Sequence, residues 1–149
     1  MTKYHLAQLN IAAMKYRMES AEMSDFVANL ERINGLADNS PGFVWRLQTE
    51  DGNATEIRLF GEYTLVNLSV WHDLESLRDF VYDTAHAAIM RRRREWFDRM
   101  QQGHMVLWWI PATHLPSLEE ARSRLELLQE NGASPEVFTF SQPFSLPGK

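Results

Sequence analysis

The sequence contains no cysteine among its 149 residues. Disulfide bonds, thiolate nucleophiles and cysteine-ligated metal sites are therefore excluded. Long apolar runs are also missing, since 18 uncharged apolar residues never occur together. The opening MTKYHLAQLN lacks a basic region followed by an apolar stretch. These absences predict neither a membrane span nor a secretion signal, and we expect a cytoplasmic protein.

Positive charge is scarce over the chain as a whole. The chain has 15 Lys and Arg side chains against 20 Asp and Glu side chains, for a net charge of -5. A protein that tracks a nucleic-acid backbone normally carries a basic surplus, so no nucleic-acid partner is expected. The exception is the run RRRR at 91–94. In a helix these side chains point in four directions, and most of them are expected on a solvated face with local ion pairs.

The pattern of apolar residues predicts the order of the elements. Alternation is typical of strands, and spacings of three and four are typical of helices. Strands are predicted at 4–12, 43–48, 64–71 and 105–110, and helices at 21–37, 74–102 and 117–132. This order is the ferredoxin-like βαββαβ pattern of an α+β fold, with an extra C-terminal helix. The length predicts a single domain, 1–149, whose C-terminal helix and tail span about 117–149.

Several predicted strands are apolar on both faces. Helices packed on one face of a four-stranded sheet leave the other face open, and a large apolar surface needs a cover. In this topology the usual cover is a second subunit, with two sheets closing into a barrel. We therefore expect a homodimer.

Five segments carry a resemblance to known proteins: HLAQLNIA, SPGFVWRLQTEDGNAT, NLSVW, RRRREWF and LWWIP. Over nearly the whole chain they resemble a bacterial domain-of-unknown-function family, number 3291. More broadly, the element order resembles the dimeric α/β-barrel superfamily, which includes the antibiotic-biosynthesis monooxygenases and the haem-degrading monooxygenases. The resemblance implies the fold, while the smaller family has no established activity to transfer.

The superfamily offers two precedents for a site. Its cofactor-independent, quinone-forming members use an Asn and a Trp four residues apart on the third strand, which Asn67 and Trp71 resemble. Its haem-degrading members use an Asn on the first strand, a Trp near the end of the third and a His on the following helix as iron ligand. Asn10, Trp71 and His86 resemble that set. The resemblance thus implies either no cofactor or haem.

Strand periodicity gives an independent view of the same residues. Side chains two apart share a face, which groups Asn67 with Trp71 and Asn10 with Gln8. Strands one and three are neighbours in the expected fold, so the two asparagines could lie close together. Either they are structural amides that pair within the sheet, or they stabilise negative charge on a substrate oxygen while Trp71 packs against an aromatic ring.

On the second predicted helix, Tyr82, His86 and Arg93 lie on one row. Arg93 is then the arginine that points inward, toward a core acid or an anionic ligand group, and a shift in the apolar phase makes Arg92 its rival. His86 could be a general base, a haem ligand or a core histidine bonded to a carbonyl.

The chain has five tryptophans. Aromatic walls with a few polar groups are typical of a small-molecule pocket. We expect the substrate-binding residues of such a pocket to be Arg93, Trp45, Tyr82, Trp96 and Trp108. The other histidines show no spacing typical of a metal site, so no metal is expected unless haem binds His86.

Three functions remain open from the sequence. The first is a cofactor-independent monooxygenase acting on a hydrophobic aromatic small molecule, with Asn67, Trp71, His86 and Asn10 as catalytic residues. The second is haem binding or breakdown through His86, with arginines at the propionates. The third is a non-catalytic small-molecule-binding dimer.

Overall fold

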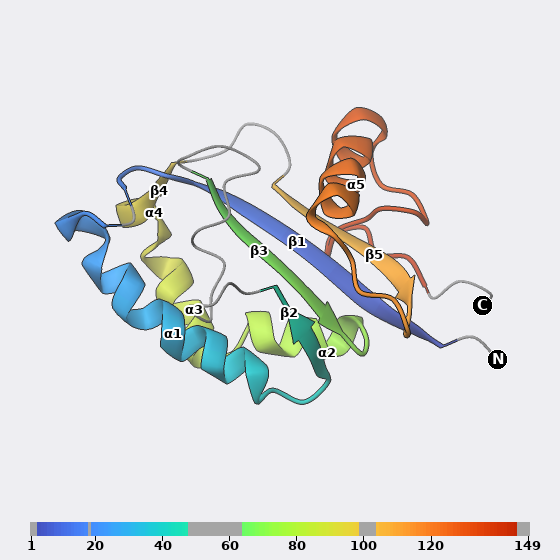
Figure 1. The fold of residues 1–149 in the computed structure, drawn as a ribbon, viewed down its shortest axis with the longest axis horizontal. Coiled ribbons are helices and arrows are strands. Elements are labelled where there is room, and N and C mark those ends of the chain that lie inside the picture. Colours follow the sequence, from blue (N-terminus) through green and yellow to red (C-terminus); the bar gives the residue numbers. More distant parts are fainter. Residues whose placement is uncertain (1–2, 18, 48–63, 99–103, 146–149) are drawn as a thin grey trace.

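A curled antiparallel sheet forms the centre of the molecule (Figure 1). The computed structural model describes residues 3–17, 19–47, 64–98 and 104–145. The strands are β1 (Tyr4–Met14), β2 (Phe43–Arg46), β3 (Thr64–Trp71), β4 (Phe97–Asp98) and β5 (Met105–Pro111). Their spatial order is β2-β3-β1-β5, and β4 pairs with the far end of β1 on the β5 side. This is the predicted ferredoxin-like arrangement, with long β1 at its centre.

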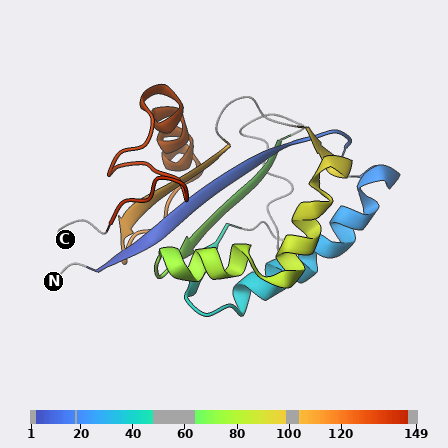
Figure 2. The ribbon, with the colours of Figure 1, turned by 180° about the vertical axis from the view of Figure 1, so that it is seen from behind.

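Helices cover one face of this sheet (Figure 2). They are α1 (Ser24–Asp38), preceded by a 3-10 turn (Ala21–Met23), and α2 (Leu74–Val81), α3 (Thr84–Arg91) and α4 (Arg93–Trp96). The segment predicted as one helix, 74–102, therefore contains three short helices. Its last four residues lie outside the described part of the chain. Residue 48, the last of the second predicted strand, also lies outside it. α2 ends at a C-cap at Tyr82, and α4 ends because Phe97 has the extended backbone of β4.

The two faces of β1 have different chemistry, as the alternation predicts. Leu6, Gln8 and Asn10 face the helices, whereas Ala7 and Leu9 face away from them and are fully buried. The same division continues on β3, because the register pairs Gln8 with Ser69 and Asn10 with Asn67. The polar residues of both strands therefore meet on the helix-facing side of the sheet.

The other face of the sheet is covered by the chain's own C-terminal helix, α5 (Leu118–Asn131). Ser117 begins this helix by accepting a hydrogen bond from the Glu120 backbone nitrogen, as the SLEE capping box predicts. Ala121 and Leu125 are buried against the apolar residues of β1, β3 and β5. α5 thus covers the part of this apolar face that β1 and β5 form, and the homodimer stays a prediction.

We expect Leu125→Ala to test this cover. Leu125 is 3% exposed, so truncation should lower the free energy of unfolding by about 2–5 kcal/mol. Leu115, which is 53% exposed just before α5, provides a matched control whose truncation should change it by no more than about 0.5 kcal/mol. Urea unfolding gives both values, and sedimentation equilibrium should give one unchanged mass. A mass that halves in Leu125→Ala would show that this face is a subunit interface.

None of the helices in the described ranges is long and apolar enough to cross a membrane.

Candidate functional site

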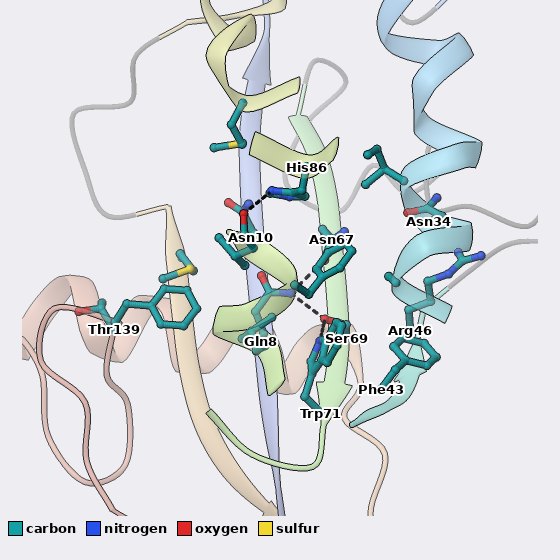
Figure 3. A pocket seen from close by; sticks show the side chains of 18 of the residues that line it. Gln8, Asn10, Asn34, Phe43, Arg46, Asn67, Ser69, Trp71, His86 and Thr139 are labelled. Atoms are coloured by element: carbon teal, nitrogen blue, oxygen red, sulfur yellow. Dashed lines mark hydrogen bonds between the residues drawn. The ribbon is translucent and has the colours of Figure 1, made fainter. Parts of the chain in front are cut away.

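A cavity of about 370 Å³ lies between the helix-facing side of the sheet and helices α1 to α3 (Figure 3). Its polar lining residues are Gln8, Asn10, Asn34, Arg46, Asn67, Ser69, His86, His104, Thr139 and Ser141. Its aromatic lining residues are Phe43, Trp71, Phe80 and Phe140. All four residues that the sequence singles out as catalytic, Asn67, Trp71, His86 and Asn10, line this one cavity.

Gln8 organises the floor of the cavity. Its Nε2 donates to Asn67 Oδ1 and to Ser69 Oγ, both at 2.9 Å. Ser69 Oγ also accepts a hydrogen bond from Trp71 Nε1 at 2.9 Å. Gln8 and Ser69 are buried, at 6% and 5% exposure, so the two bonds to Ser69 form away from water. Four side chains of two neighbouring strands are thereby fixed in one row (Figure 3).

The row leaves unused hydrogen-bonding groups beside the cavity. Because Gln8 engages Asn67 Oδ1, the Asn67 amide nitrogen keeps both protons, and no described residue accepts either of them. Asn67 is exposed within the open cavity. Its register partner Asn10 has a buried Oδ1 with no hydrogen-bond partner among the described residues. A buried polar atom without a partner is unfavourable, so this pair is suited to meeting a ligand.

Trp71 is a packed wall of the cavity. It is 1% exposed, and its ring stacks on Phe80 with centroids 5.3 Å apart and meets Phe43 edge-on at 5.4 Å. Its only nitrogen is already bonded to Ser69. Trp71 therefore shapes an apolar surface and offers neither a hydrogen bond nor a free ring face to a ligand.

His86 enters the cavity from α3. Its Nδ1 lies 2.9 Å from the backbone oxygen of Val81. A carbonyl oxygen can only accept, so Nδ1 carries the proton and Nε2 of the neutral ring keeps a lone pair. Burial lowers the pKa of His86, while the Val81 carbonyl and the nearby Asp83 act in the opposite direction. The neutral imidazole is thus the favoured form near neutral pH.

The chemistry of the site is that of a proton acceptor in a largely apolar cavity. No group of three or more His, Asp or Glu side chains among the described residues could hold a metal ion. No carboxylate of the described residues lines the cavity. His86 and the amide donors can therefore deprotonate a bound hydroxyl and stabilise the resulting anion.

The model of one protein family, the domain of unknown function DUF3291, matches residues 5–149. The chain belongs to this family. None of the curated proteins with which the chain was compared matches it. The family assignment agrees with the resemblance seen in the sequence, and it supplies no activity.

This DUF3291 chain is similar to several solved structures. A conserved protein from Methanosarcina mazei Go1 is 12% identical, covers 72% of the chain and 91% of itself, and gives a TM-score of 0.51. SnoaB, a cofactor-independent oxygenase from Streptomyces nogalater, is 17% identical, with coverages of 76% and 98% and a TM-score of 0.44. A dabb family protein with a ferredoxin-like fold from Mesorhizobium loti is 14% identical, with coverages of 76% and 100% and a TM-score of 0.45. The TM-score of 0.51 for the Methanosarcina mazei protein supports the fold alone.

The five residues predicted to bind substrate lie elsewhere in the DUF3291 chain. Trp45 and Trp108 face α5, and Trp108 Nε1 donates to Glu120 at 2.9 Å. Trp96 is buried in the core beside α1 and α4. Tyr82 is 70% exposed, and Arg93 is exposed and donates to the backbone oxygen of Met90. None of these five lines the cavity.

Two local irregularities explain these differences. A register shift between Phe43 and Trp45 places Phe43 on the cavity side and Trp45 on the α5 side, although alternation predicts one face for both. The breaks between α2, α3 and α4 interrupt the row on which Tyr82 and Arg93 were predicted. An inward direction for Arg93 required one continuous helix.

Arg92 makes a group of contacts at the start of α4. Its guanidinium lies 4.7 Å from the centre of the Trp96 ring and bonds Asp25 and Glu95 at 2.8 to 3.0 Å. The hydrogen bond from Arg92 lowers the pKa of Glu95. Arg92 thus joins α4 to α1. Neither Arg92 nor Arg93, the two candidates for an inward arginine, lines the cavity.

Phe80, Arg46 and the tail residues 139–141 line the cavity without having been singled out from the sequence. Arg46 is held by Asp38 at 2.7 and 3.2 Å, a local pair that spacing alone does not reveal. The tail reaches the cavity only through long-range packing, so local patterns carry no signal for it.

Proposed function

We propose that this cavity binds a small aromatic compound with a ring hydroxyl and oxidises it with molecular oxygen, without a bound cofactor. The observation that carries the proposal is the hydrogen bond between His86 Nδ1 and the Val81 oxygen, because it leaves Nε2 as a proton acceptor. The apolar wall that Phe80 forms over Trp71 suits a planar ring. The resemblance to quinone-forming monooxygenases suggests the class of reaction.

The first step is removal of the hydroxyl proton by His86 Nε2. A phenolate reduces oxygen far more readily than a phenol, so deprotonation starts the reaction. The Asn67 amide nitrogen, oriented through Gln8, donates to the oxygen that becomes negative. Orienting this donor before the reaction avoids the cost of turning it during the reaction.

The balance of the reaction is simple. The anion gives two electrons to oxygen, and a carbon–oxygen bond forms at the ring carbon para to the hydroxyl. The peroxide anion that results takes back the proton from His86 and becomes a hydroperoxide. The hydroperoxide then loses water: the hydrogen on that carbon leaves as a proton, the oxygen–oxygen bond breaks, and this proton joins the departing hydroxide. One oxygen atom remains in the quinone and the other leaves in water.

Haem fits the cavity poorly. His86 Nε2 could hold the iron, but Arg92 and Arg93, which would have to bind the propionates, do not line the cavity. Arg92 is bonded to Asp25 and Glu95, and Arg93 is exposed. The arginine that does line the cavity, Arg46, is already paired with Asp38. The proposal therefore gives haem no part in the reaction.

1-Naphthol is a suitable first probe, since its oxidation product, 1,4-naphthoquinone, is separated easily by chromatography. We expect the protein to form the quinone in air and none under argon, while calorimetry shows binding under both gases. Binding without quinone formation in air would contradict the enzyme and favour a binding protein. No binding under either gas would reject the ligand class.

A further inference from the structure

The C-terminal tail returns to the edge of the sheet after α5. Gly132, with a φ of +78°, ends the helix, and a turn follows between Ser134 and Val137. Phe138 then exchanges two backbone hydrogen bonds with Leu107 of β5, at 2.8 and 2.9 Å. Val137 packs on the α5 side of the sheet and Phe138 on the cavity side, both almost fully buried. The tail is thus fixed to the free edge of β5 on both faces.

A second contact fixes the tail six residues later. Trp109 Nε1 donates to the backbone oxygen of Phe144 at 3.0 Å. Between the two fixed points the chain makes a turn, in which the Gln142 backbone nitrogen donates to the Thr139 oxygen at 3.2 Å and the Thr139 and Ser141 hydroxyls lie 3.0 Å apart. This turn forms one wall of the cavity.

Phe140 is the largest side chain of that wall. Its ring lines the cavity and lies 5.8 Å from the Arg78 guanidinium of α2. α2 also carries Phe80, whose ring stacks on Trp71. The tail wall and the aromatic wall therefore both meet α2, and Phe140 bounds the cavity on the side of the tail.

We propose that Phe140 determines the size of the aromatic ligand that the cavity accepts. The ring stands at the β5 side of the cavity, and the amide row and His86 lie on β1, β3 and α3. A ligand whose hydroxyl meets His86 is then limited in length by the Phe140 ring. The choice of an aromatic hydroxyl compound as ligand rests on the proposed function. The selection by ligand size rests only on the position of Phe140 in the cavity wall.

Calorimetry with phenol, 1-naphthol and 1-anthrol, which have one, two and three rings, tests this proposal. Phe140→Ala should raise the affinity for 1-anthrol relative to 1-naphthol about tenfold, because the third ring takes the vacated space. Phe140→Trp should shift the preference by a similar factor toward phenol. Opposite shifts cannot both arise from partial unfolding. Gln142→Ala, an exposed side chain of the same turn, should leave the ratios unchanged.

Ratios that stay equal in wild type, Phe140→Ala and Phe140→Trp would overturn the proposal, as would a uniform loss of affinity for all three compounds. Shifted ratios without any quinone formation would support the role of Phe140 and reject the proposed oxidation. Failure of all three compounds to bind the wild-type protein would reject the ligand class and both proposals with it.

Discussion

Replacing His86 with glutamine is expected to lower kcat for 1-naphthol about 10³-fold. Glutamine can still donate to the Val81 oxygen, but it has no group that accepts a proton near neutral pH. Binding should change much less than turnover, because the walls and the amide row remain. Stopped-flow oxidation and calorimetry separate the two quantities.

His104→Gln provides the control for this substitution. His104 also lines the cavity, but its side chain is exposed and no described residue bonds to it. We expect the rate of this variant to stay within about threefold of the wild-type rate, as for other exposed side chains. Equal losses in the two variants, or a normal rate in His86→Gln, would remove His86 from the mechanism.

The pH dependence of kcat/KM follows from the same residue. A general base must be deprotonated, so the rate falls as pH drops through the pKa of His86. Burial lowers that pKa, which places the acid limb below about 6.5, the ordinary value for histidine. The limb should disappear in His86→Gln. An acid limb above that value would mean that another group titrates.

The second large effect is expected at Asn67. Asn67→Leu should lower kcat/KM about 10²- to 10³-fold, since it removes the donor that faces the developing charge. The free energy of unfolding should change little, because Asn67 is exposed within the cavity. Urea unfolding and steady-state rates measure the two effects. Unchanged turnover in Asn67→Leu would exclude the oxyanion role.

Gln8→Leu tests whether Gln8 acts by orienting the Asn67 amide, because this variant keeps Asn67 but removes the hydrogen bond to it. Gln8 is buried and donates to two side chains, so its loss should cost about 1–3 kcal/mol of stability as well as rate. If Gln8 acts by orienting Asn67, the double variant should be no slower than Asn67→Leu alone. Additive losses in rate would show that the two amides act separately.

The placement of Asn10, Asn67 and Trp71 around one cavity could be predicted from the sequence because it depends on strand geometry. A period of two places Gln8 with Asn10 and Asn67 with Trp71, and the antiparallel order makes the two strands neighbours. The observed register places Asn10 opposite Asn67. What local patterns could not reveal is the Gln8 bond to both Asn67 and Ser69, because it depends on side-chain orientation across the strands.

The residues predicted to bind substrate lie outside this cavity for two physical reasons. Both faces of the sheet are apolar, so a large aromatic residue such as Trp108 satisfies either face equally well. Arg93 depended on helix phase, which the breaks after α2 and α3 changed. Phe140 was not predicted, because it reaches the cavity through a tail that returns to β5 from far along the chain.

Oxidation of 1-naphthol under ¹⁸O₂ tests the central claim most directly. The account predicts that mass spectrometry finds one ¹⁸O atom in each 1,4-naphthoquinone formed by the wild-type protein. It also predicts that quinone formation by His86→Gln is about 10³-fold slower than by the wild-type protein. Quinone that contains no ¹⁸O when quinone–water exchange is controlled, or bound naphthol that stays unchanged, would contradict oxygen chemistry in this cavity.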